Sequence, residues 1–214
     1  MSDPGWRNAG PTIGAEEVDV LLSTLASASR SRAGARHLMA LAAVAALASD
    51  PRLLRLAGGG APFRATLFDK SARANWQVLW HQDTALPLER RFDAPGWGPW
   101  SVKAGIAYAH APAWALDRIV ALRLHLDDSG PDNGPLRVLE GSQARGVLSY
   151  PEVVEVAQTG RATEIHAWRG DVVVMRPLLI HASSKAASDR PRRVLHLEYA
   201  ERLDLGGGAR LAID

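Results

Sequence analysis

The sequence predicts an α+β fold, in which helices at the start of the chain pack on the outside of a β-sandwich or barrel. Three observations lead to this prediction. The first sixty residues carry helical patterns, the later residues form short runs rich in Val, Leu and Trp between turn signals, and most of these runs have no helical segment between them. A regular alternation of strands and helices would instead indicate a parallel sheet.

Three helices are predicted within residues 1–60. Residues 16–26 are amphipathic, and residues 37–48 are a Leu/Ala-rich stretch suited to a buried helix. Asp50 followed by Pro51 offers an N-cap and a proline at the first helical position of a short third helix, which the glycines at 58–60 would end. This helical part forms the outer layer of the predicted fold.

The β core is predicted within residues 61–200, and residues 1–214 are expected to form a single domain because a chain of this length can bury one substantial core. The predicted strands are residues 63–68, 76–83, 119–126, 136–139, 171–175, 178–183 and 193–199.

Residues 84–118 interrupt this pattern of short connections. A segment of this length without predicted secondary structure is usually a lid, a binding loop or a disordered segment, and an ordinary surface excursion is the remaining alternative. Trp97 and Trp100 favour a lid or substrate loop, because large aromatic side chains need burial or a ligand to pack on. Lys103 is a further candidate for contact with substrate.

Composition excludes several classes of function. The net charge is +2 with both signs scattered along the chain, so neither nucleic acid nor an anionic membrane is expected as a partner. Cysteine is absent, so a metal site would have to use His, Asp or Glu. No apolar run is long enough for a membrane span, and the polar start does not resemble a signal peptide. We expect a cytoplasmic protein, and the abundance of Arg and Ala suggests a bacterial source.

The stretch WHQD places His81 and Asp83 two residues apart at the end of a predicted strand, where they would share one face. They are either a satisfied polar pair or two ligands of a metal. His181 is the best third candidate, because it follows an apolar run and precedes small polar residues. His125 and His196 also lie within predicted strands, where a single histidine is more often part of the core.

Two histidines and a carboxylate are the ligands of non-haem Fe(II) oxygenases, and the same set can hold zinc in a hydrolase. Oxygenases that use 2-oxoglutarate also need a cation for the far carboxylate of that co-substrate, and a guanidinium suits it. Arg190, Arg192 and Arg193 precede the last predicted strand. Alternation separates Arg192 from Arg193, but does not decide which of them faces inward.

Alternation adds two more candidates near a co-substrate. If His81 faces inward, Gln77 does so as well and could donate a hydrogen bond, although it could equally be a polar residue at the mouth of the barrel. Arg123 shares a strand face with His125. Facing inward it would be a second cation near the co-substrate or an anionic substrate, and facing outward it would be a solvated charge.

Three blocks in this order, WHQD, HLDDSGPDNGPLRVLEGS and HASSKAASDRPRRVLHLEY, resemble the phytanoyl-CoA dioxygenase family of Fe(II)/2-oxoglutarate oxygenases, over roughly residues 63–200. The resemblance implies a double-stranded β-helix, or jelly roll, with the site in its open mouth. It further implies that His81, Asp83 and His181 bind the metal. Arg192, eleven positions beyond the distal histidine, would pair with 2-oxoglutarate, and Ser183 would assist.

This resemblance implies a dioxygenase that uses Fe(II), 2-oxoglutarate and O₂ to hydroxylate a small molecule, with release of succinate and CO₂. Desaturation or ring closure by the same machinery stays open, as does the choice between a monomer and a homodimer. Two other classes of function remain as alternatives. One is a cupin-like metal protein or zinc hydrolase, which would not need Arg192, and the other is a non-catalytic binding module.

Overall fold

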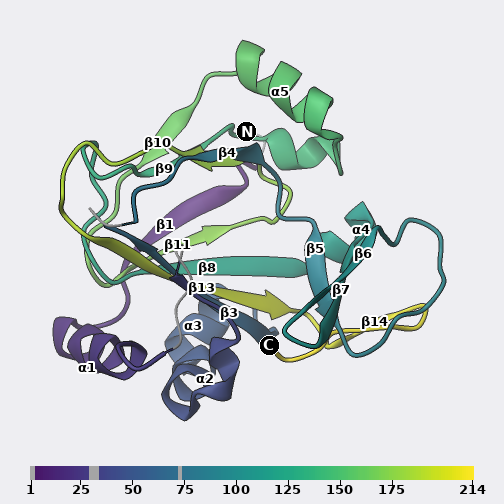
Figure 1. Ribbon diagram of the computed structural model, residues 1–214, viewed down its shortest axis with the longest axis horizontal. Helices are drawn as coiled ribbons and strands as arrows, with labels where there is room; N and C mark the ends of the chain where they lie inside the picture. Colours follow the sequence, from purple (N-terminus) through teal and green to yellow (C-terminus); the bar gives the residue numbers. More distant parts are fainter. Residues whose placement is uncertain (1–2, 29–33, 72–73) are drawn as a thin grey trace.

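Two antiparallel sheets face each other and form the core of the protein (Figure 1). The computed structural model describes residues 3–28, 34–71 and 74–214. Within them, the larger sheet has six strands in the order β1-β11-β8-β13-β3-β2, and the smaller has four in the order β10-β9-β12-β4. The larger sheet contains β1 (Trp6–Pro11), β2 (Gly34–Ala35), β3 (Ala61–Lys70), β8 (Ile119–His125), β11 (Asp171–Met175) and β13 (Arg192–Ala200). The smaller sheet contains β4 (Val78–His81), β9 (Leu136–Val138), β10 (Thr163–Ile165) and β12 (His181–Ser183).

This arrangement is the jelly roll expected from the sequence. A buried apolar cluster that includes Leu136, Val138, Val173 and Leu179 joins the two sheets. Each predicted core strand has a counterpart in the structure, with ends that shift by a few residues. Buried polar side chains, among them Arg123, His181 and Arg192, gather in the interior near the candidate ligands.

Three N-terminal helices cover the outer face of the larger sheet, as predicted (Figure 1). They are α1 (Ala15–Leu25), α2 (Ala42–Ala48) and α3 (Pro51–Leu56). Asp50 caps α3 by accepting a hydrogen bond from the Arg52 backbone N–H at 2.7 Å. The helix predicted over residues 37–48 is interrupted, because Leu41 adopts an extended conformation between a 3₁₀ turn (Leu38–Ala40) and α2. No helix among the described residues is long and apolar enough to cross a membrane.

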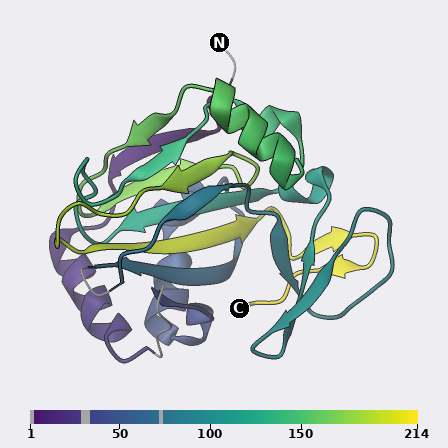
Figure 2. The ribbon, with the colours of Figure 1, turned by 45° about the horizontal axis from the view of Figure 1, so that its top comes forward.

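The reading of the first sixty residues as purely helical is wrong for β1. This strand pairs with β11 at the edge of the larger sheet. Its sequence, WRNAGP, has no alternation of apolar and polar residues, because it is an edge strand with one side open. Helix α5 (Tyr150–Thr159), which lies outside the smaller sheet in Figure 2, was also not predicted. Ser149 and Glu152 form a capping box at its start, a signal that the sequence does carry.

Residues 84–118 are not a loop without secondary structure, which corrects the prediction. They form a three-stranded sheet in the order β5-β7-β6 and a short helix, beside the C-terminal hairpin at one end of the sandwich (Figures 1 and 2). Their apolar side chains form a buried cluster with the C-terminal segment. The elements are β5 (Ala85–Leu88), β6 (Trp100–Lys103), β7 (Ile106–His110), α4 (Ala113–Leu116), β14 (Asp204–Gly206) and β15 (Ala209–Arg210).

Alternation along β13 decides which side chains reach the interior of the sandwich. Leu195 and Leu197 pack with the N-terminal helices on the outer face. Arg192 and His196 therefore point between the two sheets, and both are 4% exposed. Arg193 lies on the other face, where it forms an ion pair with Asp127 at 2.7 Å. The structure thus selects Arg192 as the arginine that faces inward.

The loop between β8 and β9 carries the chain from one sheet to the other. It contains the Asn-Gly turn signal, and Gly134 has a φ of 69°. A Cβ at this position would lie 2.5 Å from the carbonyl oxygen of Ser184, so the loop can pass the segment after β12 only with glycine here. Asn133 holds the same loop by donating to the Asp128 carbonyl at 2.8 Å.

Candidate metal centre

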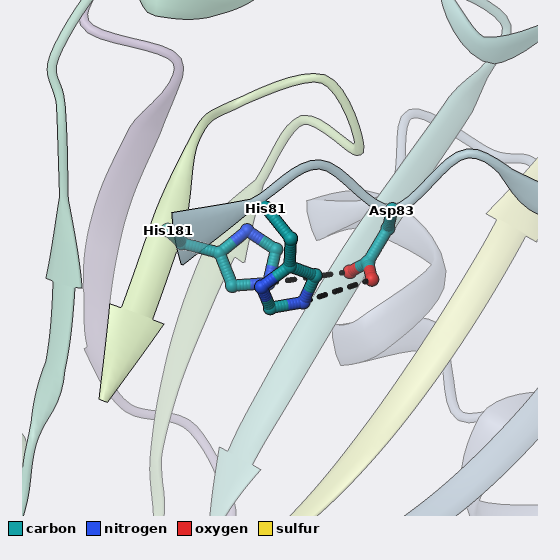
Figure 3. Close-up of side chains that lie close together, drawn as sticks. All are labelled: His81, Asp83 and His181. Atoms are coloured by element: carbon teal, nitrogen blue, oxygen red, sulfur yellow. Dashed lines mark ion pairs between the residues drawn. The ribbon is translucent and has the colours of Figure 1, made fainter. Parts of the chain in front are cut away.

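His81, Asp83 and His181 lie close together (Figure 3), where the edge strand β4 of the smaller sheet pairs with β12. His81 ends β4 and His181 begins β12, and the two are direct partners in the antiparallel pairing of these strands. Asp83 follows β4 and points back toward both rings, with carboxylate-to-Nε2 distances of 3.6 Å to His81 and 3.5 Å to His181. One ligand atom from each residue fits within 4.8 Å of the others, which is compact enough for a single metal ion.

The hydrogen bonds of the two imidazoles fix which nitrogen is available to a metal. Nδ1 of His81 lies 2.8 Å from the Leu79 carbonyl, and Nδ1 of His181 lies 2.8 Å from the Leu179 carbonyl. A carbonyl can only accept, so each Nδ1 carries the proton and each Nε2 presents its lone pair. Both Nε2 atoms are the ones that face Asp83. Backbone carbonyls are the partners that orient metal-binding histidines in many proteins.

The charge states of the cluster also suit a metal. Burial opposes ionisation of Asp83, but its attraction to the neighbouring imidazoles when these are protonated, and to the Arg64 guanidinium, holds the pKa of its carboxyl well below the ordinary value. Burial lowers the pKa of His181 to about 4 despite the attraction of Asp83, so its ring is neutral at physiological pH. A carboxylate and neutral imidazoles are the forms that bind a divalent cation. Adjacent ligands of an octahedral ion with bonds of about 2.1 Å lie about 3 Å apart, so small rotations would bring these groups into place.

Gln82, between the two WHQD ligands, holds the segment in place. Its amide donates to the carbonyls of Gly146 and Leu178, both at 2.8 Å, and accepts from the Leu148 N–H at 2.9 Å. The Asp83 N–H donates to the Pro177 carbonyl at 2.9 Å. The ligand-bearing segment is therefore anchored to two other loops, although Asp83 itself lies outside a strand.

A small cavity of about 80 Å³ opens beside the three ligands and contains three of the predicted site residues. Arg192, Arg123 and Ser183 line it together with His81, Asp83 and His181. Each of the first three is at most 6% exposed. The inward orientation of Arg123, which alternation alone left open, is the one that the structure has.

Sequence reasoning missed Lys70, a buried lysine that contacts Ser183 in the wall of the same cavity. Its side chain is 1% exposed, and its ammonium donates to the Ser183 hydroxyl at 3.2 Å and to the Ser184 carbonyl. Lys70 is the register partner of Arg192 on the adjacent strand. Burial and then Arg192 lower its pKa to about 8. The signal in the sequence was a lysine at the end of an apolar strand in a chain with three lysines.

Gln77 does not reach the site, which corrects the prediction from alternation. In the pairing of β4 with β12, His81 lies opposite His181 but Val78 lies opposite Ser183, so β4 carries a bulge. Because of the bulge, Val78 and not Gln77 points to the same face as His81. Val78 therefore lines the small cavity, whereas Gln77 is exposed.

The structure also places Trp97 and Trp100 away from the metal ligands. Both pack edge-on against Phe92, with ring centroids 5.1 and 5.4 Å away, in the cluster that holds the β5-β7-β6 sheet. This packing fits a structural role instead of the predicted contact with substrate. Lys103 is different, because it lines a second and larger cavity.

The larger cavity has a volume of about 300 Å³ and shares His81, Asp83 and Phe68 with the small one. The metal ligands therefore stand where the two cavities meet. Its wall includes a buried ion pair between Arg64 and Glu198, inward-facing residues that sequence reasoning did not select.

Buried neutral histidines should make the fold sensitive to acid. Burial, followed by the charges of Arg123 and Arg192, lowers the pKa of His125 to about 3, compared with 6.5 in the unfolded chain. Between these values the unfolded state binds a proton that the folded state excludes, so this contribution to stability is complete above pH 6.5 and is lost as the pH falls. When the pH falls from 7 to 4.5, the free energy of unfolding measured in urea should decrease by roughly 2–3 kcal/mol more in wild type than in His125→Gln. Equal losses in the two proteins would contradict the prediction.

A jelly roll with two histidines and one carboxylate at its open end defines the class of non-haem iron oxygenases. The chain belongs to one family within this class: the phytanoyl-CoA dioxygenase family profile matches residues 15–194. The resemblance drawn from the three sequence blocks is thereby confirmed. No curated protein sequence matches the chain at a significant level.

Solved structures with the same fold support the assignment of the architecture. AviO1 from Streptomyces viridochromogenes Tue57 is 23% identical, with a TM-score of 0.65 over 99% of this chain and 94% of that one. HygX from Streptomyces hygroscopicus, solved with nickel and 2-oxoglutarate bound, is 18% identical, with a TM-score of 0.66 over 99% of this chain and 93% of that one. SnoN, a non-haem α-ketoglutarate-dependent epimerase from nogalamycin biosynthesis, is 16% identical, with a TM-score of 0.66 over 93% and 79% of the two chains.

Proposed function

We propose that the protein is an Fe(II)- and 2-oxoglutarate-dependent dioxygenase that hydroxylates a small molecule. His81, Asp83 and His181 would hold the iron, and Arg192 would bind the far carboxylate of 2-oxoglutarate in the small cavity. Iron with this co-substrate and O₂ supplies the oxidation of a C–H bond, coupled to the loss of CO₂ from 2-oxoglutarate and the formation of succinate. The family and the ligand set support this proposal.

The observation that carries the proposal is a pair of buried guanidinium groups without an acidic partner. Neither Arg192 nor Arg123 forms an ion pair with a described carboxylate, and Nε of each is buried without a hydrogen-bond partner among the described residues. Burial lowers the pKa of Arg192 to about 9 and that of Arg123 to about 10, and both stay charged at neutral pH. Uncompensated buried charge is costly, so a cavity built this way fits an anion.

Each wall of the small cavity would contribute to holding the co-substrate. Arg192 offers two parallel N–H donors that match a carboxylate. Ser183 accepts from Lys70, which leaves the hydroxyl proton of Ser183 free to donate into the cavity. Val78 and Leu136 supply apolar surface for the carbon chain of the co-substrate.

The same ligand set can hold zinc in a hydrolase, but such an enzyme has no need for two unpaired guanidiniums beside the metal. The outcome of the oxidation is a separate question, because the solved structures with this fold include an epimerase. Hydroxylation is the proposal, and product analysis would distinguish it from epimerisation, desaturation or ring closure.

Binding of iron and 2-oxoglutarate tests the proposal without knowledge of the substrate. Protein loaded anaerobically with Fe(II) and 2-oxoglutarate should develop a weak metal-to-ligand charge-transfer band in visible light, because the co-substrate chelates an open metal site. Admission of O₂ should bleach the band and release succinate slowly even without substrate. A protein that binds Zn(II) tightly, shows no band and releases no succinate would contradict the proposal and favour the hydrolase.

A further inference from the structure

The larger cavity is lined almost entirely by residues whose side chains carry a polar or charged group. Of its described lining residues, only Phe68 and Ala85 have purely apolar side chains. The wall around them is made of charged groups, imidazoles, hydroxyls and an amide. A long acyl chain placed here would remove these groups from water without replacing their hydrogen bonds, which is unfavourable. The cavity therefore suits a hydrophilic molecule.

The acids of this cavity already have partners. Glu198 forms an ion pair with Arg64 and is 1% exposed. Asp214 accepts from the Tyr108 hydroxyl and lies 2.8 Å from Nδ1 of His37. The charge of Glu198 is balanced by Arg64, and Asp214 attracts the nearby Lys103. Glu198 and Asp214 therefore do not indicate a cationic substrate.

Two cations of the larger cavity, Lys103 and Arg36, have no ion pair among the described residues of the kind that joins Arg64 to Glu198. Neither Lys103 nor Arg36 forms an ion pair with any carboxylate in the part of the chain that the structure describes. The Lys103 ammonium lies 4.6 Å from the centre of the Tyr108 ring, at the end of β6. Partial burial, followed by the charges of Arg36 and Arg64, holds the pKa of Lys103 below its usual range against the attraction of Asp214. Apart from the metal ligand Asp83, the described lining of the cavity has three cations, Arg36, Arg64 and Lys103, against the two carboxylates of Glu198 and Asp214.

We propose that the substrate is a small hydrophilic molecule with an anionic group, which Lys103 and Arg36 bind while the rest of the molecule extends toward Asp83. This inference rests on the proposed function and specifies its substrate class. Anchoring one end of the substrate would hold its reacting carbon beside the metal ligands, where orientation favours the reaction. Arg64 stays paired with Glu198 and forms part of the wall instead of the anion site.

The chain offers a direct measurement, because its lysines are only Lys70, Lys103 and Lys185. Protein loaded with Ni(II) and 2-oxoglutarate would be acetylated briefly with acetic anhydride, with sodium sulfate as the anionic probe or sodium chloride at equal ionic strength. Sulfate at a few times its Kd should slow acetylation of Lys103 roughly fourfold, because most sites are then occupied. Exposed Lys185 is the internal control and should react at the same rate in both salts. Equal rates at Lys103 in the two salts would overturn the inference.

Variants show whether the anion site is the one described. Arg36→Gln should abolish the protection of Lys103 by sulfate. Arg161 is an exposed arginine outside the cavity, so Arg161→Gln should leave this protection intact.

Among candidate substrates, hydrophilic anions should accelerate succinate release most, and Lys103→Gln should raise KM for them far more than it lowers kcat. A long-chain acyl thioester or a neutral compound as the strongest activator would overturn the inference.

The charge-transfer band separates this inference from the proposed function. Lys103→Gln should form the charge-transfer band at the same 2-oxoglutarate concentrations as wild type, because Lys103 does not line the small cavity. A band without sulfate protection means that the enzyme class is right and the substrate class is wrong. Absence of the band in wild type would instead contradict the proposed function itself.

Discussion

Replacement of His181 by alanine should remove stoichiometric Fe(II) binding and, with it, all succinate release. His181 supplies one of only three protein ligands in the cluster, and its Nε2 is fixed toward Asp83 by the bond from Nδ1 to the Leu179 carbonyl. Loss of a group that merely orients a ligand typically costs ten- to a hundredfold in metal affinity, so loss of a ligand should cost on the order of a hundredfold or more. His81→Ala and Asp83→Ala should have the same consequence.

Metal content after anaerobic loading with one equivalent of Fe(II) and desalting measures this effect directly. His166→Ala is the matched control, because His166 is an exposed histidine whose side chain pairs with Glu164 and with no other residue that the structure describes. The variant at 181 should keep the far-UV spectrum of wild type, since a small side chain at the first residue of β12 does not disturb the apolar cluster between the sheets. Full iron content in His181→Ala would show that a different residue completes the metal site.

The sequence was sufficient for most strands of the two core sheets, although not for the edge strands β1, β2 and β10, because buried strands and N-caps are local signals. Strand β11 was predicted with both ends correct, and the Asp50 cap of α3 is the one that the structure has. Edge strands carry less information: β1 is held by its pairing with β11, more than a hundred and fifty residues away. The sheet in residues 84–118 is stabilised by packing against the C-terminal segment, a long-range contact that no short window of sequence contains.

The residues of the candidate site likewise differ in whether local sequence or the pairing of distant strands determines their position. His81 and Asp83 could be selected from the sequence because they share a face at the end of a predicted strand, and His181 because it follows an apolar run; the resemblance to the family then joined the three. Gln77 was selected wrongly, because a bulge in β4 shifts the alternation and leaves no mark in the sequence. Lys70 was missed because its importance depends on the strand beside it, where Arg192 is its register partner. Positions that depend on pairing between distant strands needed the structure.

Arg192→Gln should weaken 2-oxoglutarate binding roughly ten- to a hundredfold, which corresponds to about 1.5–3 kcal/mol for a charge-assisted pair. Anaerobic titration of the charge-transfer band measures this affinity, and Fe(II) binding should hardly change because Arg192 is not a metal ligand. Arg193→Gln is a matched control, since the neighbouring side chain points to the other face and pairs with Asp127. Arg192→Lys should recover only part of the affinity, because an ammonium cannot form the two parallel bonds of a guanidinium.

The stability of the same variants distinguishes a ligand-binding arginine from a structural one. A structural arginine would lower the free energy of unfolding when it is removed, but Arg192 is buried beside Arg123 without an ion pair among the described residues. Its removal should therefore leave the melting temperature of the protein without 2-oxoglutarate unchanged or raise it, because a buried like-charge contact disappears. The increase in melting temperature on addition of 2-oxoglutarate should shrink in step with the lost affinity. If that increase survives in Arg192→Gln but disappears in Arg123→Gln, the far carboxylate binds Arg123 instead.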